Sequence, residues 1–571
     1  MRKVLFGILV FVLLCGAGTG FAGEAREVYA EKGMVSSAHE MASKAGVEIL
    51  QKGGNAIDAA VATSLALSVV EMHFSGVGGG GFATIRFAKT GEVVFLDYRE
   101  EAPASATKDM YESEQAKNEK WSSIGGKSVG VPGWLLGLDT MLKKYGTMTF
   151  AQVAEPAIRL AEEGWIVEPN QTKWYESMFM PFDKYYDLLE VPFLNEGLPY
   201  QPGEKLSMPN LAKTYRLIGE KGPSVFYEGE IGEAFVKEVN RIGGKMTMED
   251  LKNYSVKYRK PVEGTYKGYK IYSAPPASSG GAHIVQALNL MEKMDLQGKD
   301  VDSPDRLHVL AEIYRIVFAD REKYMADSDF VKVPVEGLSS KEYAATLVDQ
   351  INRTSTMEKV SAGDPWPFDP SRRTSYKKAG PDAIGFNTTS LAAIDAEGNM
   401  VACTNSHNYP AGYVSGYDII LNNHLDDFSK SSASVNAPEP GKRPLSSMSP
   451  TIILTPDGSP FMAVGSAGGW RIITAVSQII MNAIDYGMGM SQAIQQPRIF
   501  TYSIAGKPSG LLMEKGIPQS TIDVLGLYGE KVDLRDYGDY FGTSQGILFD
   551  RKKGMLNGGA DSRRLGVPVG Y

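Results

Sequence analysis

Three hydroxyl side chains in a row, Thr388, Thr389 and Ser390, begin a strand-like segment in the last third of the chain. They follow Asn387 and a polar stretch from about residue 353 to 382, whose proline, serine and basic residues predict an exposed linker. A threonine hydroxyl is a weak nucleophile that needs an adjacent base. Because strands often begin with threonine, this pattern alone is also that of an ordinary strand start.

Signatures of other chemistries are weak. The six histidines form no HExxH motif and the two cysteines form no CxxC motif, so we expect no metal site. Residues 76–82, GVGGGGF, formally fit the GxGxxG pattern of nucleotide-binding proteins. That pattern requires a strand before it and a helix after it, and here the order is reversed. The glycines are better explained by close backbone packing.

The elements around these motifs follow from hydrophobic periodicity. Residues 38–72 predict two helices separated by Gly53 and Gly54, and the second helix is apolar all round, so it should be buried. FATIRFA and GEVVFLDYRE predict two strands joined by a turn. The segment MVACTNSHN should pair with the strand that begins at Thr388, which would bring Thr404, Ser406 and Asn408 close to that threonine.

The two parts of the chain differ in character. Helical stretches dominate from about residue 130 to 290, whereas strand-like segments and one long apolar helix follow the linker. A helix-rich part and a strand-rich part divided by an exposed linker are what one precursor cut into two subunits would show. We found no internal repeat.

The composition and the N-terminal residues indicate where the protein is located and which partners are poor candidates. Of the 571 residues 43% are hydrophobic, and the formal net charge is −8, so nucleic acid is a poor candidate partner. Arg2 and Lys3 precede a short apolar run and a small-residue stretch, which predicts a signal peptide over residues 1–22 and export to the periplasm or the medium. Lipid attachment at Cys15 and a retained anchor stay open as alternatives. Cys403 should be a buried small hydrophobe.

Several motifs resemble those of the γ-glutamyltranspeptidase (glutathione hydrolase) family over nearly the whole mature length. The first part carries KGGNAIDAAVA, GVGGGGF, DYREEAPASATKDMY, GVPG, KYGTM and PPASSGG, and the second carries NTTS, LNNHLDDF, KRPLSSMSPT, GSAGGWRI, GTSQGI and a terminal GY. The resemblance implies an α/β fold, a four-layer αββα sandwich of the N-terminal nucleophile hydrolase type. It implies self-cleavage between Asn387 and Thr388 into subunits 23–387 and 388–571 that together form one αββα unit.

The physics of that cleavage is direct. Scission before Thr388 creates an α-amine on the residue that carries the nucleophilic hydroxyl. An α-amine has an ordinary pKa of about 7.7–8, so a useful fraction is neutral near pH 7 and can serve as the base. The uncut precursor lacks this amine and should be inactive. No cofactor is implied.

The resemblance also assigns the site residue by residue. Thr388 is the nucleophile, and Ser406 matches a hydroxyl residue that hydrogen-bonds it. Gly468 and Gly469 match the pair whose backbone N–H groups form the oxyanion hole. The family's pocket binds a zwitterionic glutamyl group, and the matching residues are Arg99, Ser446 and Ser447 for the α-carboxylate and Asn408, His424 and Asp427 for the α-amino end.

Three positions depart from the family pattern. Ser390 replaces a common histidine, and we expect a modest effect on processing. His424 stands where the family has Gln or Glu, and an imidazole accepts a hydrogen bond when neutral but repels an ammonium when protonated, especially at acid pH. Trp470 follows the oxyanion glycines where a small residue is common, and either narrows the pocket or packs in the core.

Three functions fit these features. The first is transfer or hydrolysis of γ-glutamyl amides such as glutathione through a threonine acyl-enzyme, with water or an amino acid or peptide as acceptor. The second is a related acylase with another acyl preference, such as glutaryl groups on β-lactam nuclei, which the departure at His424 favours. The third is a secreted binding protein that has lost catalysis.

Overall fold

The computed structural model describes residues 27–371 and 387–571. The predicted signal peptide and the last part of the predicted linker lie outside these residues. Before that gap, the stretch from residue 351 to 365 has no helix or strand, as the linker prediction requires, and the short turn η4 (Trp366–Phe368) follows it. Among the described residues, every helix is too short or too polar to cross a bilayer.

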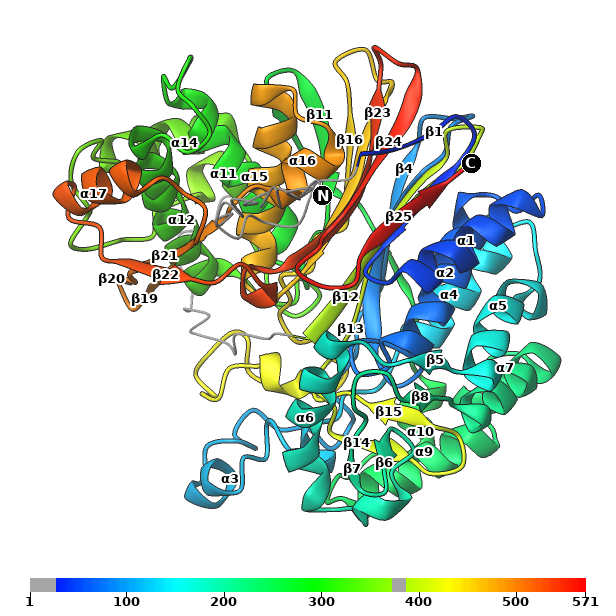
Figure 1. Cartoon of the computed structure of the whole chain (residues 1–571). Helices are drawn as coiled ribbons and strands as arrows, with labels where there is room; N and C mark the ends of the chain where they lie inside the picture. The colour runs from blue at the N-terminus through cyan, green and yellow to red at the C-terminus, as the bar shows by residue number, and fades with distance from the viewer. Residues whose placement is uncertain (1–26, 372–386) are drawn as a thin grey trace, which may run out of the picture.

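Two antiparallel seven-stranded sheets face each other at the centre of the molecule (Figure 1). In spatial order, the first sheet contains β1 (Val28–Ala30), β24 (Met555–Ala560), β23 (Thr543–Asp550), β17 (Pro460–Ala467), β16 (Thr451–Leu454), β11 (Tyr269–Ser273) and β10 (Val262–Tyr266). The second contains β25 (Val567–Gly570), β2 (Met34–Ser37), β12 (Asn387–Ile394), β13 (Met400–Asn408), β3 (Gly80–Arg86), β4 (Val93–Tyr98) and β9 (Lys257–Arg259).

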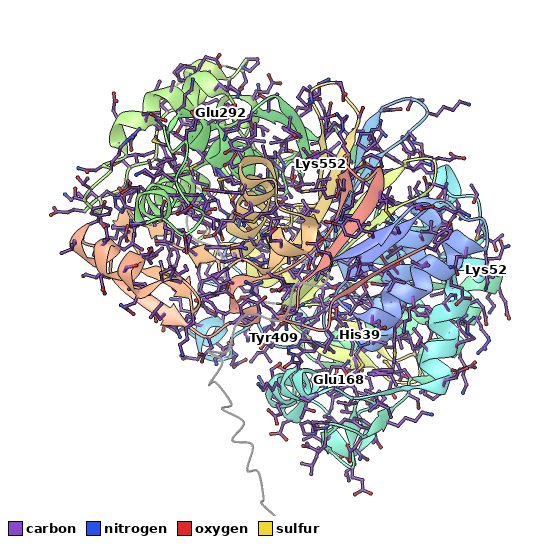
Figure 2. The ribbon with its side chains drawn as sticks, turned by 45° about the horizontal axis from the view of Figure 1, so that its top comes forward. His39, Lys52, Glu168, Glu292, Tyr409 and Lys552 are labelled. Carbon is purple, nitrogen blue, oxygen red and sulfur yellow. The ribbon has the colours of Figure 1, made fainter. Side chains whose placement is uncertain are left out.

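Helices cover the outer face of each sheet. The second sheet is covered by α1 (Glu40–Gln51), α2 (Ala56–Val70), α4 (Trp134–Tyr145), α5 (Phe150–Glu163) and α7 (Pro209–Lys221). The first is covered by α11 (Gly280–Lys293), α12 (Pro304–Tyr324), α14 (Lys341–Leu347), α15 (Arg471–Tyr486) and α16 (Met490–Gln495). Lys52, at the end of α1, and Glu292, in α11, accordingly lie on opposite sides of the molecule (Figure 2). The four layers confirm the predicted αββα sandwich.

Strand β12 shows how the sequence builds these layers. Successive side chains of a strand point to opposite faces. Ala392 and Ile394 pack between the sheets against Ile452 and Ile547, whereas Leu391 faces the helices. Both faces of β12 are buried, and a slip of one residue would exchange the side chains of the two faces, so its register is fixed.

The predicted elements around residues 38–98 are confirmed. Helices α1 and α2 are separated at Lys52–Asn55, as the glycine pair predicted, and every residue of α2 is buried. The glycine-rich stretch packs tightly, because a Cβ atom on Gly81 would lie 2.5 Å from the Thr404 carbonyl oxygen. The role predicted for those glycines, close backbone approach, is therefore confirmed. Cys403 is a fully buried strand residue, also as predicted.

The remaining helices lie outside the two central sheets. The helices are α3 (Glu114–Asn118), α6 (Pro169–Asp183), α8 (Ser224–Tyr227), α9 (Glu230–Arg241), α10 (Met248–Lys252), α13 (Val335–Leu338) and α17 (Gln519–Leu527). The strands that matter below are β14 (Gly412–Val414) and β15 (Ile419–Leu421), which form a hairpin leading to the 3-10 turn η5 (His424–Asp427).

Candidate active site

Thr388 lies in a break of the strand ladder at the start of β12. Asn387 pairs with Asn408 and Thr389 pairs with Asn405, so the register shifts across Thr388 and leaves it without a partner in the ladder. Such a bulge redirects a side chain out of the regular alternation. The Thr388 side chain is 6% exposed and lines a cavity. The predicted pairing of this strand with residues 400–408 is confirmed.

Ser406 links the Thr388 hydroxyl to the bond that precedes it. The Ser406 hydroxyl donates to the Asn387 carbonyl oxygen at 2.6 Å, and its oxygen accepts from the Asn408 backbone N–H at 2.8 Å. Its oxygen also lies 3.2 Å from the Thr388 hydroxyl oxygen. A hydroxyl has one proton to donate, and Ser406 gives it to Asn387, so the Thr388 hydroxyl is the donor in this contact.

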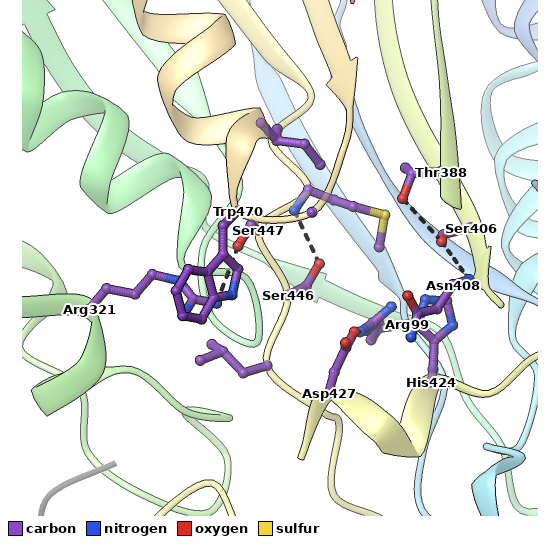
Figure 3. Close-up of a pocket in the computed structure, with 14 residues that line it drawn as sticks. Arg99, Arg321, Thr388, Ser406, Asn408, His424, Asp427, Ser446, Ser447 and Trp470 are labelled. Carbon is purple, nitrogen blue, oxygen red and sulfur yellow. Dashed lines mark hydrogen bonds and ion pairs between the residues drawn. The ribbon is translucent and has the colours of Figure 1, made fainter. Parts of the chain in front are cut away.

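The cavity gathers most of the predicted site residues, as Figure 3 shows. Those that line it are Arg99, Thr388, Ser406, Asn408, His424, Asp427, Ser446, Ser447 and Gly469. Asn387 and Gly468 do not line it but are chain neighbours of residues that do. The sequence interpretation missed four further lining residues, Arg321, Leu445, Met448 and Ile472.

Asn408 closes the end of β13 in an unusual backbone conformation. Its φ angle is +59°, in the left-handed region that asparagine tolerates better than most residues. This turns the chain away from the sheet after Ser406. Asn408 is the last residue of β13 to pair in the ladder, and it lines the cavity.

The buried Arg99 and the partly buried Asp427 form an ion pair on the cavity wall. Nη2 of Arg99 lies 2.5 Å from Oδ2 of Asp427, and Nε of Arg99 donates to the Pro444 carbonyl at 3.3 Å. Arg99 follows β4, whereas Asp427 ends the turn η5, so two distant parts of the chain meet here. The pair offers one cation and one anion to a ligand that carries both charges.

Arg321 and Trp470 form a second wall of the cavity. Nη2 of Arg321 donates to the Ser447 hydroxyl at 3.2 Å, and its Nε donates to the Ser279 hydroxyl at 2.9 Å. The guanidinium lies 4.9 Å from the centre of the Trp470 ring, which stacks on Phe318. Trp470 therefore both narrows the pocket and packs in the core. A buried arginine in the last turn of a helix gives no motif, which is why the sequence interpretation missed Arg321.

Gly468 and Gly469 join β17 to α15 beside the cavity. Gly468 and Gly469 have φ angles of +128° and +60°, and a Cβ atom on Gly468 would lie 2.8 Å from the Cα of Gly542. Their carbonyls accept the first hydrogen bonds of α15, from Arg471 and Ile472. The N-terminus of a 16-residue helix thus faces the cavity, and its positive field favours negative charge there.

His424 is a buried residue of the cavity wall. Burial, with the nearby Arg99 guanidinium, holds the pKa of His424 well below its usual range. The imidazole is therefore neutral at ordinary pH. The expectation that it repels an ammonium by becoming charged at acid pH is corrected, because burial keeps the charged form out of reach.

The residues on the other face of β12 are polar and buried. The Thr389 hydroxyl donates to Oε2 of Glu71 at 2.9 Å, and burial raises the pKa of Glu71 to about 6. Nη1 of Arg564 donates to the Thr388 carbonyl at 2.7 Å, and its guanidinium lies 3.8 Å from the centre of the Phe74 ring. These contacts fix the backbone of the predicted nucleophile from behind.

Two other chemical patterns contribute no site. Within the described ranges, His308, Glu312 and Glu530 could hold a metal ion by their spacing. The Arg315 guanidinium already donates to both carboxylates, at 2.5 Å and 2.6 Å, so the cluster is an ion-pair network. Residues 542–546, GTSQG, fit the GxSxG spacing of serine hydrolases. Ser544 lies inside β23 and bonds Ser466, whereas such a nucleophile needs a strand-to-helix turn.

A four-layer αββα sandwich with a threonine at the start of a central strand defines the class of N-terminal nucleophile hydrolases. The solved structures agree. A cephalosporin acylase from Bacillus halodurans is 28% identical, with a TM-score of 0.84 over 98% of this chain and 99% of that one. The Helicobacter pylori γ-glutamyltranspeptidase is 41% identical, with a TM-score of 0.54 over 60% of this chain and 96% of that one.

Sequence comparison narrows the class to one family. The gamma-glutamyltranspeptidase family model matches residues 42–571. The Escherichia coli glutathione hydrolase proenzyme is 38% identical over 95% of this chain and 93% of its own. The acylase ACY 1 proenzyme of Pseudomonas sp. strain V22 is 36% identical over 96% of this chain and 95% of its own. The chain belongs to the gamma-glutamyltranspeptidase family.

Proposed function

We propose that the chain cuts itself between Asn387 and Thr388 and then transfers or hydrolyses γ-glutamyl groups. The observation that carries the proposal is the hydrogen-bond chain from the Thr388 hydroxyl through Ser406 to the Asn387 carbonyl. The Thr388 hydroxyl is close to the bond to be cut, and Ser406 polarises the carbonyl of that bond. Attack would move the Asn387 acyl group from nitrogen to oxygen, and water would release the new N-terminus.

In the mature enzyme, the roles divide among the cavity residues. The Thr388 α-amine takes the hydroxyl proton, and the hydroxyl oxygen attacks the γ-amide carbonyl. The backbone N–H groups of Gly468 and Gly469, with the field of α15, stabilise the oxyanion. The leaving amine departs protonated. Water or an acceptor amine then resolves the acyl-enzyme.

The substrate's charged end fits the ion pair on the wall. The α-carboxylate would pair with Arg99 and accept from Ser446 and Ser447, and the α-ammonium would pair with Asp427. Each ion then exchanges one partner for another within the same cavity. A zwitterion therefore enters while Arg99 and Asp427 each keep a partner of opposite charge.

The test is the N-terminal sequence of the smaller fragment. Purified wild-type protein should give two bands on a denaturing gel, with the smaller chain beginning Thr-Thr-Ser. Thr388→Ala should give one uncut band and no turnover, whereas Thr388→Ser retains a hydroxyl and should still cut. A Thr388→Ala protein that cuts at the same bond would refute self-cleavage.

A second candidate is an acylase with another acyl preference. The departure at His424, where the family has Gln or Glu, favours it, and acylases are among the relatives. Release of p-nitroaniline from γ-glutamyl and glutaryl anilides separates the two. The first proposal requires a higher kcat/KM with the γ-glutamyl compound, and equal or greater glutaryl activity would favour the acylase.

We propose further that the protein is exported and that residues 1–22 are removed as a signal peptide. Arg2, Lys3 and the apolar run behind them support this. Cell fractionation with N-terminal sequencing of the larger fragment tests it. A large fragment that begins at Met1 would refute removal of the signal.

A further inference from the structure

Glu100 lies directly behind His424, outside the cavity that His424 lines. The Glu100 side chain is fully buried, and its Oε1 lies 2.7 Å from Nδ1 of His424. The backbone N–H of His424 donates to the Asn422 side chain at 3.0 Å, and that side chain donates in turn to the Gly78 and Gly130 carbonyls. The imidazole is thus held in one place. Its two ring nitrogens point in roughly opposite directions, so Nε2 points away from Glu100.

Charged and titratable groups surround this pair. Arg99, whose Nη1 lies 3.5 Å from Oε2 of Glu100, is ion-paired with Asp427, and Arg443, His407 and Tyr227 also interact with Glu100. Burial lowers the pKa of His407 to about 3 and raises that of Tyr227, so both are neutral. Burial also raises the pKa of Glu100 to about 7 despite Arg99. Glu100 is therefore the member that titrates near neutrality.

The number of protons that Glu100 and His424 hold together determines whether Nε2 of His424 is a hydrogen-bond donor or an acceptor toward the cavity. When Glu100 is ionised, the proton between the two groups sits on Nδ1, and Nε2 carries a lone pair that accepts a hydrogen bond. When Glu100 takes up a proton, its O–H donates to Nδ1. The neutral imidazole then carries its own proton on Nε2, which becomes a donor.

We propose that Glu100 sets the substrate preference of His424 by choosing its tautomer. The ionised carboxylate makes Nε2 an acceptor for an α-ammonium, as a γ-glutamyl group requires. The protonated carboxyl makes Nε2 a donor, which excludes the ammonium and suits an acyl group that lacks it. The inference rests on the proposed γ-glutamyl function and makes Glu100 a positioning residue that acts through His424.

Calorimetric binding of L-glutamate and of glutarate to the processed protein, at about pH 6, 7 and 8, tests this. Glutarate carries no amine, so it controls for the carboxylate subsites. The ratio of the glutamate Kd to the glutarate Kd should rise about tenfold from pH 8 to pH 6, because proton uptake by Glu100 competes with the ammonium. The KM for γ-glutamyl p-nitroanilide, relative to that for the glutaryl compound, should follow the same curve.

Two variants make the outcome decisive. Glu100→Gln cannot titrate, so its ratio should not change with pH. His424→Gln places an amide oxygen at the subsite whatever the state of Glu100, so glutamate should bind at pH 6 about as well as at pH 8. A merely structural role for Glu100 would weaken both ligands equally at every pH.

A wild-type ratio that does not change with pH would overturn the inference, as would a Glu100→Gln protein that keeps the wild-type slope. Failure of L-glutamate to bind at all three pH values would overturn it as well. The proposed function is tested by a separate measurement, the turnover of the anilide substrate. A processed protein without anilide turnover but with the expected binding ratio would contradict that function alone, and an active enzyme with a constant ratio would contradict the inference alone.

Discussion

The Arg99 side chain contacts residues from distant parts of the chain at the proposed substrate site. It is 1% exposed, and its partners Asp427 and Pro444 come from the far side of the proposed cleavage bond. A guanidinium meets a carboxylate with two parallel N–H groups, which an ammonium cannot do. Removing the charge altogether would take the Arg99 cation away from Asp427, so the informative change keeps the positive charge and alters the shape of the group that carries it.

Arg99→Lys should therefore raise the KM for γ-glutamyl p-nitroanilide about tenfold, or about 1.4 kcal/mol, because the fork to the α-carboxylate is lost. The kcat should change little, since the oxyanion contacts are elsewhere. Steady-state kinetics on the processed protein give both constants, and Arg535→Lys, an exposed arginine, is the matched control. A fall in kcat at constant KM would contradict a binding role.

Strand β12 is positioned by the two strands that pair with it and by side chains on its helix-covered face. The Arg564 guanidinium, between β24 and β25, donates to the Thr388 carbonyl and stacks on Phe74. This contact fixes the bulge that turns the Thr388 hydroxyl toward Ser406. A charged donor to a buried carbonyl contributes about 1.5–3 kcal/mol.

Arg564→Met keeps the length of the side chain and its packing on Phe74 but removes the donor. We expect the free energy of unfolding to fall by about 2 kcal/mol and self-cleavage to slow severalfold. Denaturant unfolding and a gel time course of precursor loss measure the two effects. Arg535→Met should change neither, and an Arg564→Met protein that cuts at the wild-type rate would show that the bulge is held by other contacts.

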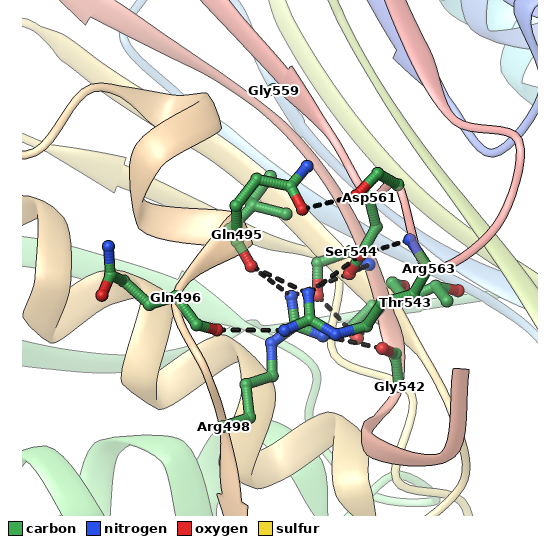
Figure 4. Close-up of polar contacts among 12 residues, drawn as sticks. Gln495, Gln496, Arg498, Gly542, Thr543, Ser544, Gly559, Asp561 and Arg563 are labelled. Carbon is green, nitrogen blue, oxygen red and sulfur yellow. Dashed lines mark hydrogen bonds and ion pairs between the residues drawn. The ribbon is translucent and has the colours of Figure 1, made fainter. Parts of the chain in front are cut away.

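A second buried network anchors the chain end that carries Arg564. Arg498, after α16, donates to Asp561 and to the Gly542 carbonyl, both at 2.7–2.8 Å, and Arg563 donates to Asp561 at 2.9 Å (Figure 4). Arg563 also pairs with Glu514 at 2.6 Å. These ions satisfy one another in the interior, so the segment before β25 has a fixed position against the first sheet.

The sequence predicted the helices and strands better than it predicted the contacts between residues that are far apart in the chain. Helices α1 and α2 and strands β3, β4, β12 and β13 follow from periodicity and glycine positions, because those are local signals. The contact of Glu100 with His424 and that of Arg321 with Ser447 join residues more than a hundred positions apart. No local pattern carries such information, and only the family resemblance placed Arg99 and Asp427 in one pocket beforehand. The roles predicted for these residues stay predictions.

For the whole molecule, buried neutral histidines set the response to acid. His283 in α11 is fully buried, bonds Gln286 at 2.8 Å, and has its pKa lowered by burial to about 3. The unfolded chain takes up this proton below pH of about 6.5, and the native chain does not until about 3. The stability contribution is thus complete above about pH 6.5 and is lost as the pH falls toward 3, at about 1.4 kcal/mol per unit.

His283→Asn keeps a donor for Gln286 but does not titrate. We expect the loss of unfolding free energy between about pH 7 and pH 5 to be about 2 kcal/mol smaller in this variant than in the wild type. Denaturant unfolding at the two pH values measures it. Val285→Ala on the same helix lowers stability without removing a titrating group, so it should keep the wild-type pH dependence. Equal losses in His283→Asn and the wild type would contradict the assignment.

The two proposed subunits contribute strands to both sheets, which determines what cleavage does to the assembly. Across the proposed bond, β2 and β3 pair with β12 and β13, and β1 and β11 pair with β24 and β16. Cutting one peptide bond at the start of β12 removes none of these ladders. Separation would break all of these strand pairings, and that of β2 with β25, and would expose the strand edges that they join together with the apolar layer between the sheets.

The fragments should therefore elute as one particle from a sizing column at any salt concentration and separate only in denaturant. Sizing at low and at about 1 M salt, followed by a denaturing gel of the peak, tests this. Both bands should appear in equal amounts in a single peak, because hydrophobic burial and backbone ladders are insensitive to screening. Dissociation at high salt would mean that surface charge holds the fragments together, and the shared-sheet account of the assembly would fail.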